Sequence, residues 1–353
     1  MPEFAPPPDG PLPDYGFSLE RQKPREEHGG TAREASAVEF PVSLGVAGVS
    51  MRLQPGAMRE LHWHANAAEW GYVVKGRCRT TLIHPGASWD AEDHDSGDTW
   101  YFPRGYGHLI QTLGDEECHF VLAFDNGYFS ENATFSVTDW LAHTPREIVA
   151  ASIGIPADEL GDLPDHEVYM AVGPVPPEPL SADATGAERP PAEGHRYPLG
   201  ASEPRRFGGG TLRIASSAEF PLARTMTAAV MELEPGAVRG MHWHPNADEW
   251  QYVLSGSARM TVFASLAKAA RVDLEAGDVG YAPMGYGHYI QNSGDEPLRM
   301  LLAFNSGTYE EIGLAAWLAG NARRSVATNL GLSEQAASRL PADDIFIAEP
   351  PAG

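Results

Sequence analysis

The chain has 353 residues, enough for two domains with full hydrophobic cores, and 42% of them are hydrophobic, as in globular proteins. Its formal net charge of −23 disfavours nucleic acid and anionic membranes as partners. No stretch approaches the roughly 18 consecutive apolar residues of a membrane-spanning helix. The N-terminus has no basic stretch followed by an apolar run, so we expect a cytoplasmic protein.

The order of composition along the chain predicts two domains and a linker. Residues 1–30 are rich in Pro, Gly and charged residues and are expected to form an N-terminal arm. We place the N-terminal domain at residues 31–170 and the C-terminal domain with its tail at 205–353. Between them, residues 171–204 are dense in Pro, Gly and Ala, which is typical of a linker.

Both domains are predicted to be mostly β-structure. Short β-branched or aromatic runs such as GVSMRL and WGYVVKG in the first domain, and AAVMELE and WQYVLSG in the second, are separated by Gly or Pro. A spacing of roughly ten residues between such runs favours an antiparallel sandwich or barrel. A helix is expected after the strands of each domain: at 138–153, where Thr-Asp can cap it, and more weakly at 313–320.

One pattern occurs in both domains and carries polar residues. Residues 62–72 read HWHANAAEWGY and residues 242–252 read HWHPNADEWQY, and a second matching fragment follows at 97–111 and 277–291. A shared core could explain repeated apolar residues, but not repeated histidines and a carboxylate. The duplication therefore preserves a site. Its residues recur at an offset of 180 (242 − 62): His62, His64, Glu69 and His108, then His242, His244, Glu249 and His288.

The spacing of these residues suits metal ligands on strands. Residues two apart on a strand face the same side, so His62 and His64 point into one interior while Trp63 points away to pack between layers, as does its counterpart Trp243. Glu69 follows after a short turn, and the fourth ligand comes from a later strand. Three imidazoles and one carboxylate fill four positions around a metal and leave two open on a six-coordinate ion.

The ligand set also bears on which metal is bound. Zinc accepts His and carboxylate, but this set would nearly fill a tetrahedral zinc, so Mn(II) or Fe(II) fits better and manganese is our choice. Histidines hydrogen-bonded in a core are the alternative, and the duplication argues against it. Cys78 and Cys118 are too few for a disulfide framework and are expected to be buried, reduced thiols.

The spacing around the ligands resembles the two sequence motifs of the cupin superfamily. Two such domains in one chain resemble a bicupin, and the resemblance implies two tandem jelly-roll β-barrels with short helical segments after each. The matching positions are Gly56, His62, His64, Glu69 and Gly76, then Gly97, Pro103, Gly105 and His108, with Gly236, His242, His244, Glu249, Gly256, Gly277, Pro283, Gly285 and His288 in the second copy.

More specific text resembles bicupin oxalate decarboxylases. In the first domain this text is PGAMRELHWH (55–64), FDNGYFSENATF (124–135) and TDWLAHTP (138–145), and the likeness runs from about residue 28 to 320. The resemblance implies cleavage of oxalate, a small dicarboxylate, to formate and carbon dioxide. It also implies two Mn(II) ions per chain, dioxygen as a co-catalyst and a homo-oligomer, a trimer or hexamer.

The resemblance assigns roles in the first domain residue by residue. The family's arginine matches Arg59, and its mobile lid matches residues 130–134, in which Glu131 is the acid and Thr134 a hydrogen-bonding partner. A metal and a guanidinium are natural anchors for a small dianion, and Glu131 can protonate the carbon that carbon dioxide leaves. One objection concerns Arg59, which lies three residues before His62. On a regular strand it would point away from the metal.

The second domain retains the ligands and an arginine, Arg239, as a possible substrate contact, but lacks the Ser-Glu-Asn-x-Thr pattern. Glu311 falls opposite Glu131 at the same offset. We therefore expect the second metal to be structural or an electron-transfer partner, with a catalytic role as the alternative. An oxalate oxidase, which would yield carbon dioxide and peroxide, or another manganese or iron cupin acting on a small acid are alternatives. A non-catalytic storage bicupin is disfavoured because all eight ligands are present.

Overall fold

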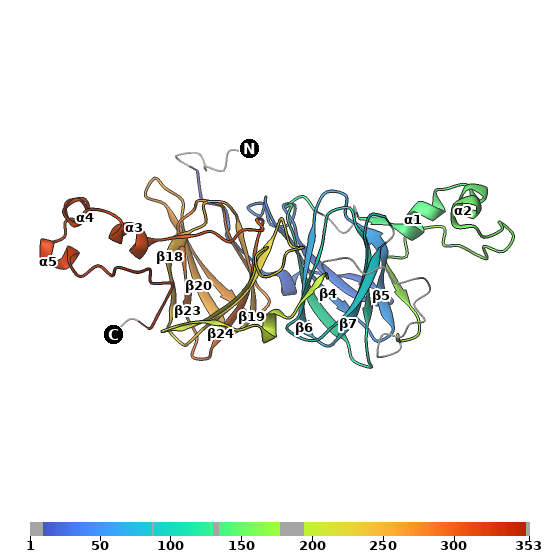
Figure 1. The fold of residues 1–353 in the computed structure, drawn as a ribbon, viewed down its shortest axis with the longest axis horizontal. Coiled ribbons are helices and arrows are strands. Elements are labelled where there is room, and N and C mark those ends of the chain that lie inside the picture. Colours follow the sequence, from blue (N-terminus) through green and yellow to red (C-terminus); the bar gives the residue numbers. More distant parts are fainter. Residues whose placement is uncertain (1–9, 87, 130–133, 177–193, 351–353) are drawn as a thin grey trace.

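The computed structural model describes residues 10–86, 88–129, 134–176 and 194–350. Two β-barrels lie side by side, and a short group of helices projects outward from each of them at opposite ends of the molecule (Figure 1). All strand pairs of both barrels are antiparallel, as short alternating strands predict. The prediction of a mostly β-chain with two tandem jelly-roll barrels is confirmed.

The N-terminal barrel consists of two sheets. The strand orders are β14-β9-β6-β11-β4-β3-β2 and β12-β5-β10-β7-β8, with β13 beside β5. Strands β5, β6 and β10 carry the predicted ligands His62, Glu69 and His108, and the fourth ligand, His64, directly follows β5. The bounds are β2 Arg25–Glu27, β3 Gly30–Ala35, β4 Ala47–Leu53, β5 Ala57–Trp63, β6 Glu69–Lys75, β7 Cys78–Ile83, β8 Trp89–His94, β9 Thr99–Phe102, β10 Gly107–Thr112, β11 Cys118–Phe124, β12 Phe135–Ser136, β13 Met170–Val172 and β14 Arg196–Tyr197.

The C-terminal barrel repeats this arrangement. Its strand orders are β1-β22-β19-β24-β17-β16-β15 and β21-β20-β23-β18-β25, with β26 beside β18. Strands β18, β19 and β23 correspond to β5, β6 and β10. The bounds are β1 Gly16–Phe17, β15 Arg205–Phe207, β16 Gly210–Ala215, β17 Thr227–Leu233, β18 Val238–Trp243, β19 Glu249–Ser255, β20 Ser257–Phe263, β21 Ala269–Glu275, β22 Val279–Ala282, β23 His288–Asn292, β24 Leu298–Phe304, β25 Ile312–Gly313 and β26 Ile347–Ala348.

Each barrel receives an edge strand from the segment that precedes the other barrel. Strand β1, within the predicted arm, pairs with β22 of the C-terminal barrel, and β14, within the predicted linker, pairs with β9 of the N-terminal barrel. The residues just before these strands are again 180 apart (195 − 15): the carbonyl of Tyr15 accepts from Tyr281, and that of His195 accepts from Tyr101. This exchange was not predicted, because two-residue strands leave no recognisable pattern.

The helical segments differ in detail from the expectation. The helix predicted at 138–153 is two helices, α1 Val137–Ala142 and α2 Arg146–Ile153, because Pro145 lacks the amide that would continue α1. Ser136 caps α1 by accepting from the amide of Asp139. None of the helices in the described residues is long and apolar enough to span a membrane. The remaining helices are α3 Leu314–Ala319, α4 Arg323–Leu330 and α5 Glu334–Ala337, with 3₁₀ turns at Leu19–Arg21 and Leu199–Ala201.

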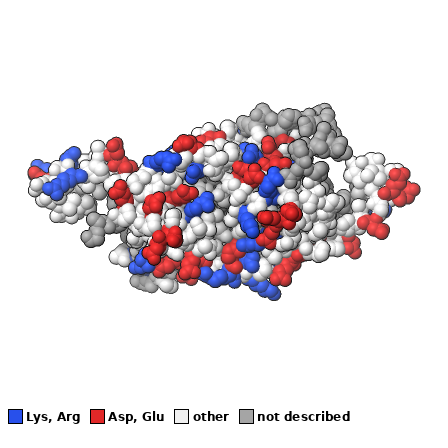
Figure 2. All heavy atoms as spheres, turned by 90° about the horizontal axis from the view of Figure 1, so that it is seen from below, with Lys and Arg blue, Asp and Glu red and all other residues white. Residues whose placement is uncertain are grey.

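The barrels pack against each other through their larger sheets. A Cβ at Gly48 would lie 2.1 Å from the Trp250 ring, and the Trp70 and Phe220 rings meet edge to face across the junction. Cys78 and Cys118 are buried free thiols, as predicted. On the face in Figure 2, acidic and basic side chains are interspersed. The formal net charge of −23 disfavours attraction of an anionic ligand by the overall field, so such attraction must come from local groups.

Candidate metal centres

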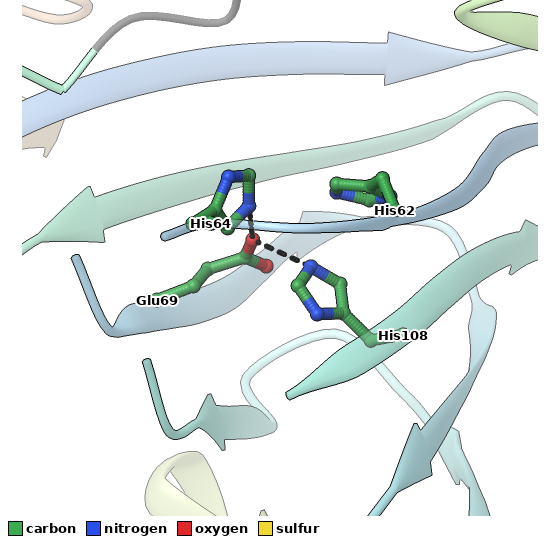
Figure 3. Close-up of side chains that lie close together, drawn as sticks. All are labelled: His62, His64, Glu69 and His108. Carbon is green, nitrogen blue, oxygen red and sulfur yellow. Dashed lines mark hydrogen bonds and ion pairs between the residues drawn. The ribbon is translucent and has the colours of Figure 1, made fainter. Parts of the chain in front are cut away.

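The predicted ligands of the first domain form one buried cluster. His62, His64, Glu69 and His108 each offer one ligand atom, and these atoms all lie within 4.8 Å of one another. Their side chains converge on one point inside the barrel (Figure 3). None of the four is more than 3% exposed, so an unpaired charge here would be costly without a counter-ion. The structure thus brings together all four residues.

The barrel topology explains this convergence. His62 and His108 are direct cross-strand partners on β5 and β10, and their rings lie 4.2 Å apart between centroids. Glu69 begins β6 on the facing sheet. The carbonyl of His64 accepts from the amide of Gly105, whose φ of +81° suits glycine. This hydrogen bond joins the turn after His64 to the turn that precedes His108.

The histidine rings are oriented with one nitrogen toward a common centre. Each Nδ1 has a partner outside the cluster, which directs Nε2 inward, as the outer contacts of metal-binding histidines do. Burial and then the charge of Arg59 lower the pKa of His62 well below its ordinary value, so its imidazole is neutral, as a metal requires. The partners are the Glu60 carbonyl for His62 (2.5 Å), the Thr134 hydroxyl for His64 (3.1 Å) and the Tyr106 carbonyl for His108 (2.8 Å).

The carboxylate of Glu69 completes the donor set. Burial raises its pKa, but hydrogen bonds and charges from His108 and His64 outweigh this and lower the pKa below its usual range. Oε2 lies 3.0 Å from Nε2 of His64 and 3.4 Å from Nε2 of His108, while Oε1 accepts from the indole of Trp100 at 2.9 Å. Three imidazole nitrogens and a carboxylate that face one point fit a divalent cation with open positions.

Arg59 lies on the same side of β5 as the ligands, contrary to the expectation for a regular strand. On β10, His108 pairs with His62 and Ile110 pairs with Arg59, so the single residue between them on β10 lies opposite two residues of β5, Glu60 and Leu61. This β-bulge inserts one residue into β5 and restores the shared side. Leu61, inside the bulge, is 48% exposed, whereas Arg59 is 1% exposed. Because of the bulge, Arg59 faces the same side of β5 as the metal ligand His62 although it lies three residues before it.

Sequence reasoning missed the residue that supports Arg59. Nη1 of Arg59 donates to the carbonyl of Tyr169 at 3.1 Å, and its guanidinium carbon lies 4.2 Å from the centroid of that ring. Arg25 stacks on the same ring at 3.5 Å. Tyr169 adopts φ of +60°, rare for a non-glycine residue, and its amide donates to Glu60. It lies just before β13, where no sequence motif marked it.

Trp63 and Thr134 lie around the outer side of the first cluster. The Trp63 ring stacks on Phe135 at 5.5 Å and meets Trp140 of α1 at 5.7 Å, so it points away from the metal ligands, as predicted. Thr134 contacts His64 rather than the cluster centre. Residue 131 falls outside the described residues.

The second cluster repeats the first. His242, His244, Glu249 and His288 satisfy the same distance limit and are equally buried. Burial raises the pKa of Glu249, but charges and hydrogen bonds from the three histidines lower it well below its ordinary value. Here Oε1 of Glu249 accepts from the Gln251 amide at 2.9 Å. The Nδ1 partners are the carbonyls of Gly240 (2.7 Å), Glu310 (2.8 Å) and Tyr286 (3.0 Å).

The second arginine has a different environment. A bulge between Arg239 and His242 again places the guanidinium on the ligand side of its strand. Nη2 of Arg239 forms an ion pair with Glu311, which also accepts from the hydroxyl of Tyr309. Glu311, which the sequence offset placed opposite residue 131, is thus bound to the arginine of its own barrel.

Comparison with known proteins agrees with this geometry. The Cupin family model matches residues 17–159 and 199–338. Oxalate decarboxylase OxdC of Bacillus subtilis (strain 168) is 44% identical over 321 residues, covering 90% of this chain and 83% of the relative. This chain belongs to the bicupin oxalate decarboxylase family. Within that family, an oxalate decarboxylase of Arthroderma benhamiae is 30% identical over 96% of this chain and 85% of its own length.

Solved structures of the family match both barrels at once. Oxalate decarboxylase from Bacillus subtilis at pH 4.6 has a TM-score of 0.91 and 41% identity, and the match covers 99% of this chain and 90% of that one. A second structure of that enzyme, which concerns its Mn(II) centres, has the same TM-score and identity over 98% of this chain and 91% of its own. The two clusters therefore lie in a shared bicupin framework.

Proposed function

We propose that this enzyme decarboxylates oxalate to formate and carbon dioxide with Mn(II), and that the first barrel holds the active site. One observation carries the proposal: the bulge in β5 places Arg59 beside three imidazoles and a carboxylate that face a common point. Oxalate is a dianion without an apolar handle, so it needs a metal and a guanidinium as anchors. The named activity of the relatives supports this substrate.

In this proposal, bound Mn(II) supplies a Lewis acid with open positions and a redox partner. The chain's own groups do the positioning. Arg59, fixed by the carbonyl and ring of Tyr169, is restricted to one geometry and can hold the carboxylate that stays in the product. It also stabilises negative charge that develops there as carbon dioxide leaves. Dioxygen as a co-catalyst is part of the proposal and rests on the family resemblance.

We assign Glu131 as the proton donor for the carbon that becomes formate. The assignment is supported by the residues on either side of segment 130–133. The Phe129 ring meets the His64 ring edge-on at 4.9 Å, and the Thr134 hydroxyl lies 3.1 Å from His64 Nδ1. A carboxylic acid held near the reacting carbon can deliver a proton before a second electron is lost. Glu131 would thus favour formate over peroxide.

The second centre is proposed to be structural or an electron-transfer partner. We further propose a homo-oligomer, a trimer or hexamer. In support, the projecting helices expose large apolar side chains: Trp140 is 64% exposed, Ile148 52% and Trp317 55%. Light scattering on the purified chain tests assembly.

Metal analysis paired with product analysis tests the function. We expect two manganese ions per chain and one formate for each oxalate consumed. Abundant peroxide with little formate would instead identify an oxalate oxidase. Normal ligand binding by a metal-free preparation would indicate a non-catalytic bicupin and contradict the proposal.

A further inference from the structure

The two arginines beside the clusters are held in the same way. Nη1 of Arg239 donates to the carbonyl of Phe346 at 3.0 Å, and its guanidinium carbon lies 3.6 Å from that ring. Arg59 uses the carbonyl and ring of Tyr169 in the same manner. Strands β26 and β13, which follow these two aromatic residues, pair with equivalent strands. Both guanidinium groups are therefore pre-positioned to hold a carboxylate.

In the second barrel the chain itself supplies that carboxylate. Glu311 Oε2 forms an ion pair with Nη2 of Arg239 and accepts from the Tyr309 hydroxyl. The side chains of Arg239 and Glu311 are only 4% and 13% exposed, so the pair lies largely out of water. The carbonyl of the preceding Glu310 accepts from His244, which fixes this segment against the metal cluster. Glu311 thus pairs with the arginine of the second barrel beside its metal cluster.

We propose that Glu311 is a specificity-determining residue: by occupying Arg239, it excludes a small carboxylate from the second metal centre. The inference rests on the proposed function, in which Arg59 binds the substrate carboxylate at the first centre. An incoming oxalate must either break the buried ion pair of Arg239 with Glu311, whose carboxylate also accepts from Tyr309, or lie beside the negative charge of Glu311. Both are unfavourable at low dielectric. A repulsive group of this kind gives specificity without a loss of metal ligands.

The role proposed for Glu311 differs from that assigned to Glu131. In its contacts with Arg239 and Tyr309, the Glu311 carboxylate accepts hydrogen bonds. In these two proposals, the glutamates at the 180-residue offset have different roles. One completes a reaction, and the other keeps the substrate out.

Isothermal titration calorimetry of the manganese-loaded full chain with oxalate tests this inference. Arg59→Ala removes the first anchor, so this variant should bind no oxalate tightly. Arg59→Ala combined with Glu311→Gln should bind one oxalate per chain, at least tenfold more tightly. Adding Arg239→Ala should abolish that binding, whereas Glu296→Gln, which removes an exposed carboxylate, should not restore it in the Arg59→Ala background.

Manganese content of two ions per chain verifies folding, and Glu311→Ala serves as a second variant if Glu311→Gln loses metal. Unchanged affinity in both combined variants, or tight binding by Arg59→Ala alone, overturns the inference. Formate production by the unmodified enzyme separates the two proposals. Formate without the gained binding refutes the role of Glu311 only. Gained binding in an enzyme that produces no formate refutes the proposed function and leaves carboxylate exclusion in place.

Discussion

The indole nitrogen of Trp100 lies 2.9 Å from Oε1 of Glu69, and the amide nitrogen of Gln251 lies at the same distance from Oε1 of Glu249. The strand pair β6–β9 of the first barrel corresponds to β19–β22 of the second, and the two donors lie on different members of these pairs. Trp100 on β9 faces Gly71 on β6, whereas Gln251 on β19 faces Gly280 on β22. A Cβ on Gly71 would lie 1.9 Å from Trp100, and one on Gly280 would lie 2.5 Å from Gln251. Each barrel thus combines one donor with one glycine.

Trp100→Phe should weaken manganese binding at the first centre by about 10-fold to 100-fold, as loss of outer-sphere hydrogen bonds to metal ligands does. The second centre should keep its metal. Competition with a chelator, followed by electron paramagnetic resonance of both centres, measures this. Equal loss at both centres would mean that the substitution acts through general destabilisation instead.

Glu131→Gln should lower formate production at least 100-fold while manganese content stays at two ions per chain, because the amide cannot deliver the proton. Formate and peroxide are quantified together at fixed oxalate. Glu147→Gln, which neutralises a carboxylate on the projecting helix α2, is the control. Full formate production in Glu131→Gln would show that another group is the acid.

Glu20 predicts an acid-dependent loss of stability. Burial raises its pKa, but hydrogen bonds from His119, Ser50 and Arg52 outweigh this, so the pKa falls well below the ordinary value of 4.5. Its contribution is therefore complete above about pH 4.5 and is lost as the pH falls toward the lower folded-state pKa. Glu20→Gln should reduce the free energy of unfolding at pH 7 by about 1–3 kcal/mol.

Denaturant titrations of Glu20→Gln and the unmodified chain between pH 7 and pH 3 measure this. The difference in stability should shrink as the pH falls. A difference that stays constant with pH would show that the charge of Glu20 is not what stabilises the fold.

His94 predicts a second pH effect, at higher pH. Burial and then the charges of His195 and Arg196 lower its pKa well below 6.5. The folded state therefore keeps His94 neutral while the unfolded chain gains a proton below about pH 6.5. The free energy of unfolding therefore decreases as the pH is lowered below about 6.5, by up to about 1.4 kcal/mol per pH unit for one such group. The equivalent position of the C-terminal barrel is Leu274.

His94→Leu should flatten the dependence of unfolding free energy on pH between 7 and 5. Thermal or denaturant unfolding at several pH values checks this, with the exposed His143→Leu as control. An unchanged slope in His94→Leu would assign the effect to other groups.

The metal ligands could be predicted from sequence because a duplicated set of polar residues has few alternative explanations. The side on which Arg59 lies could not, because strand alternation has a period of two and a bulge resets it. The signal was present nevertheless: Arg-x-x-His occurs before both clusters, at 59–62 and 239–242. An arginine three residues before the first ligand histidine in both copies indicates a β-bulge in each strand rather than an arginine that faces away from the ligands.

Contacts that depend on distant segments were beyond sequence reasoning. Tyr169 reaches Arg59 across 110 positions, and Glu311 reaches Arg239 across 72. Neither belongs to a motif, and neither spacing fits one local element. The offset placed Glu311 opposite Glu131 but could not show which group it would meet. Tertiary packing decides such partners.

The crossed edge strands β1 and β14 have a consequence for how this enzyme can be divided. A cut near residue 170 would separate β14 from the β9 edge that it covers, and the N-terminal fragment would take β1 away from β22. Both fragments would then carry bare hydrogen-bonding edges, which invite aggregation. Neither half is thus a detachable module. A workable single-barrel version would have to be built so that β14 stays covalently joined to the N-terminal barrel and β1 to the C-terminal barrel.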